Sequence, residues 1–126
     1  MSAQSRYPER VWELFSQAPH AGRPVMEAGW RRGEAAEPLS ATRVRVYLAI
    51  SQGCIRDVRY EVRGCPFTVA AVALLASRWI GQPTDTVAVD PRGLLSELTA
   101  PVMKLGRMLV VEDAYRRALQ AADQTA

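Results

Sequence analysis

The sequence predicts an α+β domain in which helices cover one face of a small antiparallel sheet of about three strands. Two strand-like segments, 43–50 and 55–63, are joined by a very short turn, and three helix-like segments follow them. Strands joined by so short a turn must be antiparallel. Helices gathered on one face of such a sheet define the α+β class. We expect residues 1–126 to form a single domain, because this length suits one core.

The first expected element is a helix that begins near Pro8, since proline is favoured in the first turn of a helix. Apolar residues at helical spacing mark its buried face: Val11, Leu14, Phe15 and Ala18. Pro19 and Gly22 should end it. Residues 21–41 are rich in Gly, Pro, Arg and Glu. This segment is interpreted either as a long loop or as a loop with one short strand near 27–33.

Apolar and polar residues alternate along the two central segments, which indicates strands with one buried face. The expected buried face consists of Val44, Val46, Leu48, Ile50, Val58, Tyr60 and Val62. The opposite face of the second strand is charged, so we expect the sheet to be covered on one side only. Strand parity places Cys54 on the buried face, which favours a packed thiol over a metal ligand.

Three helices are expected after the hairpin. The first runs from Pro66 to Ile80 and is apolar on almost every side, so it belongs in the core. The second starts with Asp90 as its cap. The third runs from about Pro101 to Ala122, with Gly106 inside it at a cost of about 1 kcal/mol relative to alanine.

Composition excludes several classes of function. The net charge is +3 and the arginines are scattered, with one short basic–aromatic group at residues 30–32, so no nucleic-acid partner is expected. No apolar run approaches the roughly 20 residues of a membrane span, and the first nine residues lack a secretory signal. We therefore expect a cytoplasmic protein without a membrane partner. The lone histidine, His20, is interpreted as a loop residue, and no catalytic pairing supports an enzyme.

Four segments together resemble the IscU/SufU/NifU N-terminal family of iron–sulfur cluster scaffolds. They are Val11 to Gly22, Gly53 to Cys65 (GCIRDVRYEVRGC), the apolar helix ending in Trp79-Ile80-Gly81-Gln82-Pro83, and Pro101 to Leu119. Their order and spacing carry the resemblance, which covers nearly the whole chain. It implies an IscU-like fold.

The resemblance also implies where a cluster would be held. Family members use three cysteines, assisted by an Asp and by a His beside the last cysteine. Ser40 stands at the first cysteine, Thr42 at the Asp, Cys65 at the second cysteine, and Gly106 and Arg107 at the His-Cys pair. Only Cys65 keeps a family ligand. Alcohols are weak ligands, and arginine adds a permanent positive charge. No stably bound cofactor is expected, although an iron–sulfur cluster or zinc at Cys65 stays open.

Cys65 has two interpretations. It precedes a helix N-terminus, where a thiolate is stabilised, and Arg63 and Arg107 are candidate neighbouring charges. A lowered pKa and a reactive thiol are one hypothesis, and an inert turn cysteine is the other. Family scaffolds also carry a Leu-Pro-Pro-Val-Lys run that an Hsp70 chaperone reads, of which Pro101 and Lys104 stay in place as partner-binding candidates.

Three functions follow as hypotheses. The first is an accessory or regulatory member of cluster assembly that keeps the fold and Cys65 and docks on a cysteine desulfurase or a true scaffold protein. The second is a working scaffold that binds a cluster between two chains or with external thiols. The third is a binding module unrelated to iron, with Trp30, Arg31 and Arg32 as its surface.

Overall fold

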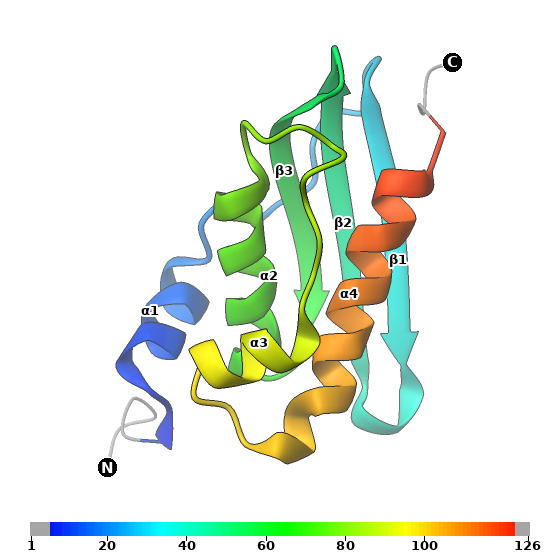
Figure 1. The fold of residues 1–126 in the computed structure, drawn as a ribbon. Coiled ribbons are helices and arrows are strands. Elements are labelled where there is room, and N and C mark those ends of the chain that lie inside the picture. The colour runs from blue at the N-terminus through cyan, green and yellow to red at the C-terminus, as the bar shows by residue number, and fades with distance from the viewer. Residues whose placement is uncertain (1–5, 123–126) are drawn as a thin grey trace.

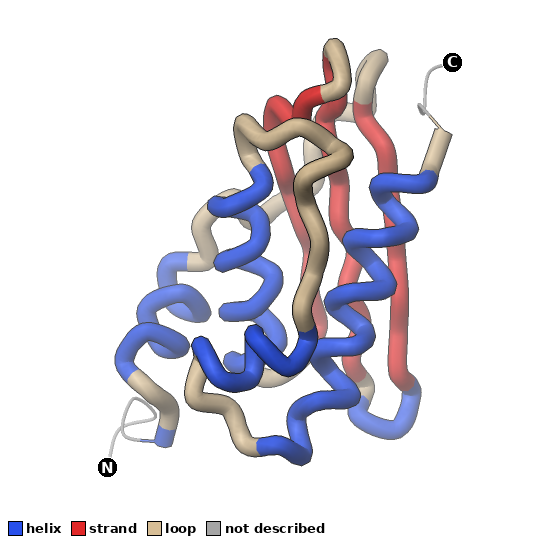
Figure 2. The backbone as a smooth tube through the Cα atoms, in the orientation of Figure 1, coloured by secondary structure: helices blue, strands red, loops and turns tan. Residues whose placement is uncertain are grey.

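The computed structural model describes residues 6–122 and confirms the α+β fold class (Figure 1). Three strands form one antiparallel sheet in the order β1-β2-β3: β1 (Trp30–Glu37), β2 (Thr42–Ser51) and β3 (Cys54–Arg63). The α-helices are α1 (Glu9–Gln17), α2 (Pro66–Trp79), α3 (Pro91–Glu97) and α4 (Leu105–Gln120). In Figure 2, α2, α3 and α4 lie in front of the sheet, and α1 packs beside α2. None of the described helices is long and apolar enough to cross a bilayer.

Part of the segment interpreted as a loop, or as a loop with one short strand near 27–33, forms β1, which begins later than that strand and has eight residues. The usual strand pattern is missing because the inward residues are small. Gly33 and Ala35 are buried where α4 packs against β1. A Cβ atom on Gly33 would lie 2.2 Å from the carbonyl oxygen of Ala114. Close packing of the helix therefore requires glycine at this point of the strand.

The basic–aromatic group at residues 30–32 does not form one surface. These residues lie in β1, and successive strand side chains point to opposite faces of the sheet. Arg31 reaches the end of α4, where its Nη1 donates a hydrogen bond to the carbonyl oxygen of Ala121 at 3.3 Å. Arg31 thus helps to hold α4 and is not part of a shared surface with Trp30 and Arg32.

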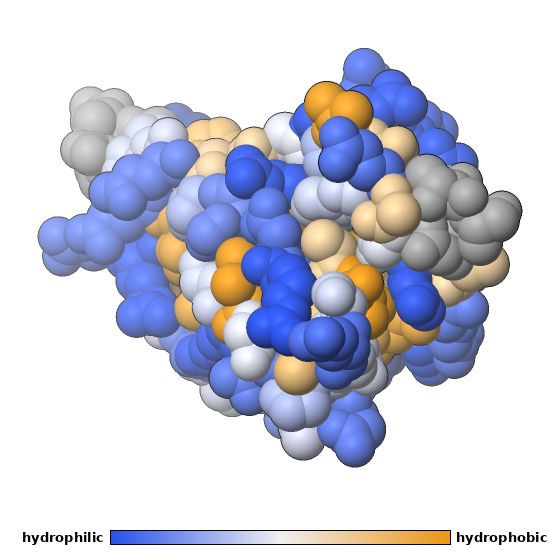
Figure 3. Space-filling model, turned by 90° about the horizontal axis from the view of Figure 1, so that it is seen from above, coloured by the Kyte–Doolittle hydropathy of each residue, from blue (hydrophilic) through white to orange (hydrophobic). Residues whose placement is uncertain are grey.

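The expected position of Cys54 is wrong, because the hairpin contains a bulge. The register passes from Ala49 opposite Asp57 to Ile50 opposite Ile55, so Arg56 is an extra residue in β3. One inserted residue reverses the facing of everything beyond it. Ile55 is fully buried in the core, and Cys54 is only half-buried. The surface at this hairpin end mixes hydrophilic residues with small separate apolar areas (Figure 3).

The second face of the sheet is not bare, in contrast to the expectation that only one side is covered. Tyr47, on the charged face, is fully buried. The segment between α1 and β1 passes behind the sheet (Figure 1). It is anchored where the Gly22 N–H donates to the carbonyl oxygen of Tyr60 at 2.8 Å and where the Gly29 carbonyl accepts from the Ile50 N–H at 2.9 Å.

The core lies between the sheet and the helices. As expected, α2 is buried on nearly all sides. The hydroxyl group of Tyr115 in α4 donates to the carbonyl oxygen of Val72 in α2 at 2.7 Å, and its ring packs on Trp79. The last helix begins later than expected, because residues 102–104 form a 3-10 turn before α4. Gly106 therefore lies in the first turn of α4, where glycine costs less than in a helix interior.

Candidate functional site

The residues that the family resemblance assigns to ligand positions lie near element ends at one end of the molecule, the lower end in Figure 1, which is called the ligand end below. Here β1 and β3 finish, and β2, α2 and α4 begin. The register pairs Glu37 with Thr42 and Arg43 with Arg63. Thr42, which begins β2, and Cys65, which follows the end of β3, therefore lie at the same end of the sheet. The first turn of α4 carries Arg107 to this end as well.

On one side of the ligand end, the turn from β1 to β2 is closed by its own hydrogen bonds. The carboxylate of Glu37 accepts from the backbone N–H groups of Leu39 at 2.9 Å and Ser40 at 2.7 Å. The hydroxyl oxygens of Ser40 and Thr42 lie 2.7 Å apart. Thr42 is buried. The two alcohols at ligand positions thus bond to each other and do not point into an open site.

Glu37 is a site residue that the sequence analysis missed. Its hydrogen bonds from the Ser40 side chain and from the backbone of Leu39 and Ser40, together with the charge of Arg107, hold the pKa of Glu37 below its usual value. Glu37 stands directly before Pro38, as a capping acid stands before a helical turn. An acid directly before a proline was the sequence signal for this cap, but it lies inside the segment that was interpreted as a loop.

On the other side, Cys65 caps the N-terminus of α2. Its carbonyl oxygen accepts from the backbone N–H groups of Thr68 at 2.9 Å and Val69 at 3.2 Å. Its half-buried Sγ lies 3.5 Å from Oγ1 of Thr68. Burial raises the pKa of Cys65, but the Thr68 hydrogen bonds and the positive charge of Lys104 outweigh it, so the pKa is lowered overall.

The two cations of the ligand end therefore act on different partners. The charge of Lys104 acts on Cys65, and the charge of Arg107 acts on Glu37. Gly106 faces open space, and Pro101 is exposed. The hypothesis that named Arg63 and Arg107 as the charges beside the thiol did not identify Lys104.

The remaining candidate ligands lie elsewhere. Cys54 is at the opposite end of β3, and a strand of ten residues spans about 33 Å. His20 lies in the loop after α1, between Pro19, whose carbonyl oxygen accepts from the Tyr60 hydroxyl group, and Ala21, which bridges to Tyr60. Within residues 6–122, no three His, Cys, Asp or Glu side chains gather as a metal site requires.

Exposed apolar side chains surround the same end. Among the described residues, five large apolar side chains are exposed, and three of them belong to the turns beside the site: Leu39, Val102 and Met103. Leu39 is 98% exposed. The arrangement thus combines one thiol of lowered pKa and two cations with an apolar rim, which suits contact with another molecule better than holding a metal ion.

Comparisons with known proteins agree with this architecture. Residues 6–124 match the family described as NifU-like N terminal domain. The structure is similar to a NifU-like N-terminal protein from Brucella abortus, with a TM-score of 0.74 and 19% identity over 98% of each chain. It is also similar to a candidate iron–sulfur cluster assembly scaffold protein for the SUF system from Fervidobacterium islandicum AW-1. That TM-score is 0.72, with 15% identity over 94% of this chain and 99% of that one. Among curated proteins none matches.

Proposed function

This chain belongs to the NifU-like N-terminal domain family, and we propose that it is an accessory or regulatory member of iron–sulfur cluster assembly. In this proposal the protein works in the cytoplasm, catalyses no reaction of its own, and keeps the fold and Cys65 without holding a cluster on the family's ligands. The family match supports the link to cluster assembly. The finer role rests on the chemistry of the ligand end.

A single observation carries the proposal: the Ser40 and Thr42 hydroxyl groups, at family ligand positions, are hydrogen-bonded to each other at 2.7 Å. Iron in such clusters is held by thiolates, with imidazole as an occasional substitute. The guanidinium group of Arg107 adds positive charge where a metal would need negative charge. A cation would have to break a satisfied polar cluster and overcome this repulsion.

Cys65 gives the proposed accessory role a chemical step. Its thiolate would attack the terminal sulfur of a donor persulfide, so that the new Cys65 S–S bond forms as the donor S–S bond breaks. The donor leaves as a thiolate, and Cys65 then carries the persulfide. Sulfur is transferred without any outside oxidant or reductant. The lowered pKa of Cys65 favours the attacking form.

The proposed partners are a cysteine desulfurase or a true scaffold protein. The exposed side chains of Leu39, Val102 and Met103 give such a partner an apolar contact around Cys65. Lys104 and Pro101, which the family resemblance marks for partner binding, lie in or beside the same turn.

The test has two arms. First, the purified protein is incubated anaerobically with iron and sulfide, and its absorption and metal content are measured with and without glutathione. We expect no stable cluster. A brown protein whose colour depends on Cys65 would overturn the accessory role in favour of a working scaffold, including one that uses external thiols.

The second arm measures binding to a desulfurase and sulfur transfer from its persulfide, read by mass spectrometry as a gain of one sulfur atom on Cys65. The Cys54→Ser variant should transfer normally and Cys65→Ser should not. Absence of both binding and transfer would contradict the proposal and leave a binding module unrelated to iron.

A further inference from the structure

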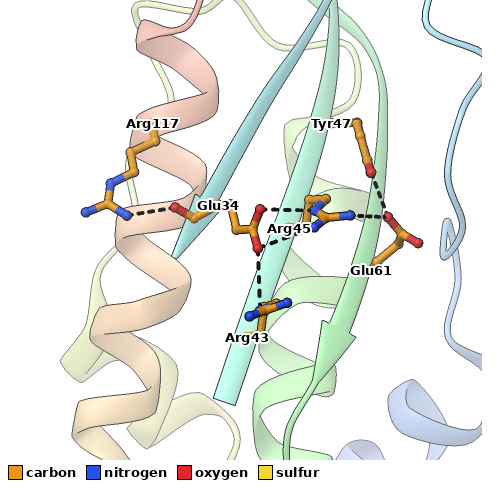
Figure 4. A network of polar contacts seen from close by, with 6 residues as sticks. All are labelled: Glu34, Arg43, Arg45, Tyr47, Glu61 and Arg117. Carbon is orange, nitrogen blue, oxygen red and sulfur yellow. Dashed lines mark hydrogen bonds and ion pairs between the residues drawn. The ribbon is translucent and has the colours of Figure 1, made fainter. Parts of the chain in front are cut away.

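The charged face of the sheet has a regular arrangement of ionic side chains with one exception. In the row formed by Glu34, Arg45 and Glu61, the central arginine is flanked by an acid on each neighbouring strand. Arg45 Nε lies 3.2 Å from Glu34, and Nη1 lies 3.4 Å from Glu61 (Figure 4). The hydroxyl group of Tyr47 donates to Glu61 at 2.6 Å. Every charged side chain of this row thus has an oppositely charged partner, and the row carries one excess negative charge.

The next row towards the ligand end is not balanced. It consists of Ala36, Arg43 and Arg63, so two arginines are direct neighbours across β2 and β3. Like charges directly opposite each other destabilise a sheet. Arg43 makes only a 3.5 Å contact with Glu34, which is already bound to Arg45. Within residues 6–122, the side chain of Arg63 makes no hydrogen bond or ion pair.

Space for a ligand lies beside this pair. A hollow of about 380 Å³ is lined by Arg43, Arg45, Glu61, Val62 and Arg63. Arg45 forms part of its wall, fixed by the two acids, and the side chain of Arg43 is 61% exposed. Arg23 adds further positive charge near Glu61. Four arginines thus stand against Glu34 and Glu61, which leaves a positive hollow at the ligand end.

We infer that Arg43 and Arg63 form a binding site for a phosphate group of a small molecule. Two guanidinium groups on neighbouring strands can each give a forked pair of N–H donors to one tetrahedral oxyanion. The bound anion would remove the repulsion between the two arginines. Arg45 stays bound to Glu34 and Glu61 as part of the wall of the hollow, so the phosphate contacts come from Arg43 and Arg63.

The test measures binding of inorganic phosphate and pyrophosphate by calorimetry at constant ionic strength, with acetate as the comparison anion. We expect phosphate to bind and acetate not to bind. Tighter binding of pyrophosphate would assign the hollow to a chain of phosphates, and equal binding would assign it to a single phosphate. Equal binding of acetate and phosphate, or no binding of either phosphate, would overturn the inference.

Variants locate the site. Arg63→Gln should weaken phosphate binding at least about tenfold, and Arg63→Lys should weaken it less, because lysine keeps the charge without the fork. Arg56→Gln is the matched control, since it removes one exposed arginine from the bulge at the far end of β3. It should bind as the unchanged protein does. An equal loss in Arg56→Gln would reduce the effect to net charge and contradict the site.

A second measurement does not depend on ligand. Without phosphate, Arg63→Gln should unfold at a higher urea concentration than the unchanged protein, because a like-charge pair is removed. Phosphate should then raise the thermal midpoint of the unchanged protein but not that of Arg63→Gln. A lower urea midpoint for Arg63→Gln would show that Arg63 stabilises the unliganded sheet, and the premise of an unbalanced row would be wrong.

Discussion

The two sides of the ligand end differ in how their polar side chains are bonded. On the strand side, Glu37, Ser40 and Thr42 bond to one another, and the turn from β1 to β2 is closed. On the helix side, Cys65 is half-buried beside Thr68 and under the charge of Lys104, while Gly106 faces open space. One side of the ligand end is therefore closed by its own hydrogen bonds, whereas the other holds a half-buried thiol whose pKa is lowered.

The largest expected effect comes from placing metal ligands at the ligand positions that now lack them. The triple variant Ser40→Cys, Gly106→His and Arg107→Cys would join the native Cys65 in a Cys3His set, which is a common structural zinc site. We expect zinc affinity to rise by on the order of a thousandfold or more. Competition with a chromophoric chelator measures this gain.

The control keeps the arginine. The double variant Ser40→Cys and Gly106→His should bind zinc far more weakly, because Arg107 still opposes the cation. If the triple variant folds but binds zinc no better than the unchanged protein, the ligand positions do not meet in space.

The next effect concerns stability on the strand side. Thr42→Val keeps the shape of the side chain but removes the hydroxyl group that lies 2.7 Å from the Ser40 oxygen. We expect the free energy of unfolding to fall by about 1 kcal/mol, as measured by urea denaturation. Because Thr42 is buried, a neutral result would mean that its hydrogen bond contributes nothing.

A smaller effect is expected in the reactivity of Cys65. Burial opposes ionisation, but the Thr68 hydrogen bonds and Lys104 lower the pKa of the thiol overall. In a Cys54→Ser background, the rate of alkylation by iodoacetamide should therefore reach half its maximum below the pH typical of a free cysteine. Lys104→Gln should move this midpoint to higher pH. A midpoint at the ordinary pKa of cysteine would favour the inert turn cysteine.

The smallest effect concerns the backbone beside the closed cluster. Ala41 adopts a left-handed conformation with φ of 53° after the turn Pro38–Ser40. Glycine enters this region without strain, but it also gives the unfolded chain more freedom. We expect Ala41→Gly to raise the free energy of unfolding by about 0.5 kcal/mol. A clear loss of stability in the same urea experiment would count against strain at this position.

The two strands with large alternating residues were predictable, and the third strand was not. In β2 and β3, bulky side chains face the helices, so the period of two is visible in the sequence. In β1 the inward positions hold Gly33 and Ala35, because α4 lies too close for larger residues. The bulge at Arg56 did leave a sign in the sequence, since two polar residues, Arg56 and Asp57, separate the buried Ile55 from Val58 and break the period of two.

The same limit applies to the site. The residue types at positions 40, 42, 65, 106 and 107 follow from the sequence and its resemblance to a family, and so does the scarcity of soft metal ligands. The bond between Ser40 and Thr42, the capping by Glu37 and the placement of Lys104 near Cys65 join separate elements. No local pattern encodes such contacts.

The sequence alone determined the α+β class, the apolar helix that fills the core, and the chemistry of each side chain at the ligand end. These depend on local periodicity and residue type. Tertiary structure alone decided which charge acts on Cys65, which arginines stand unbalanced on the sheet, and which polar groups satisfy one another. Such outcomes depend on distances between residues far apart in the chain, and those distances are set only when the strands pair and the helices pack.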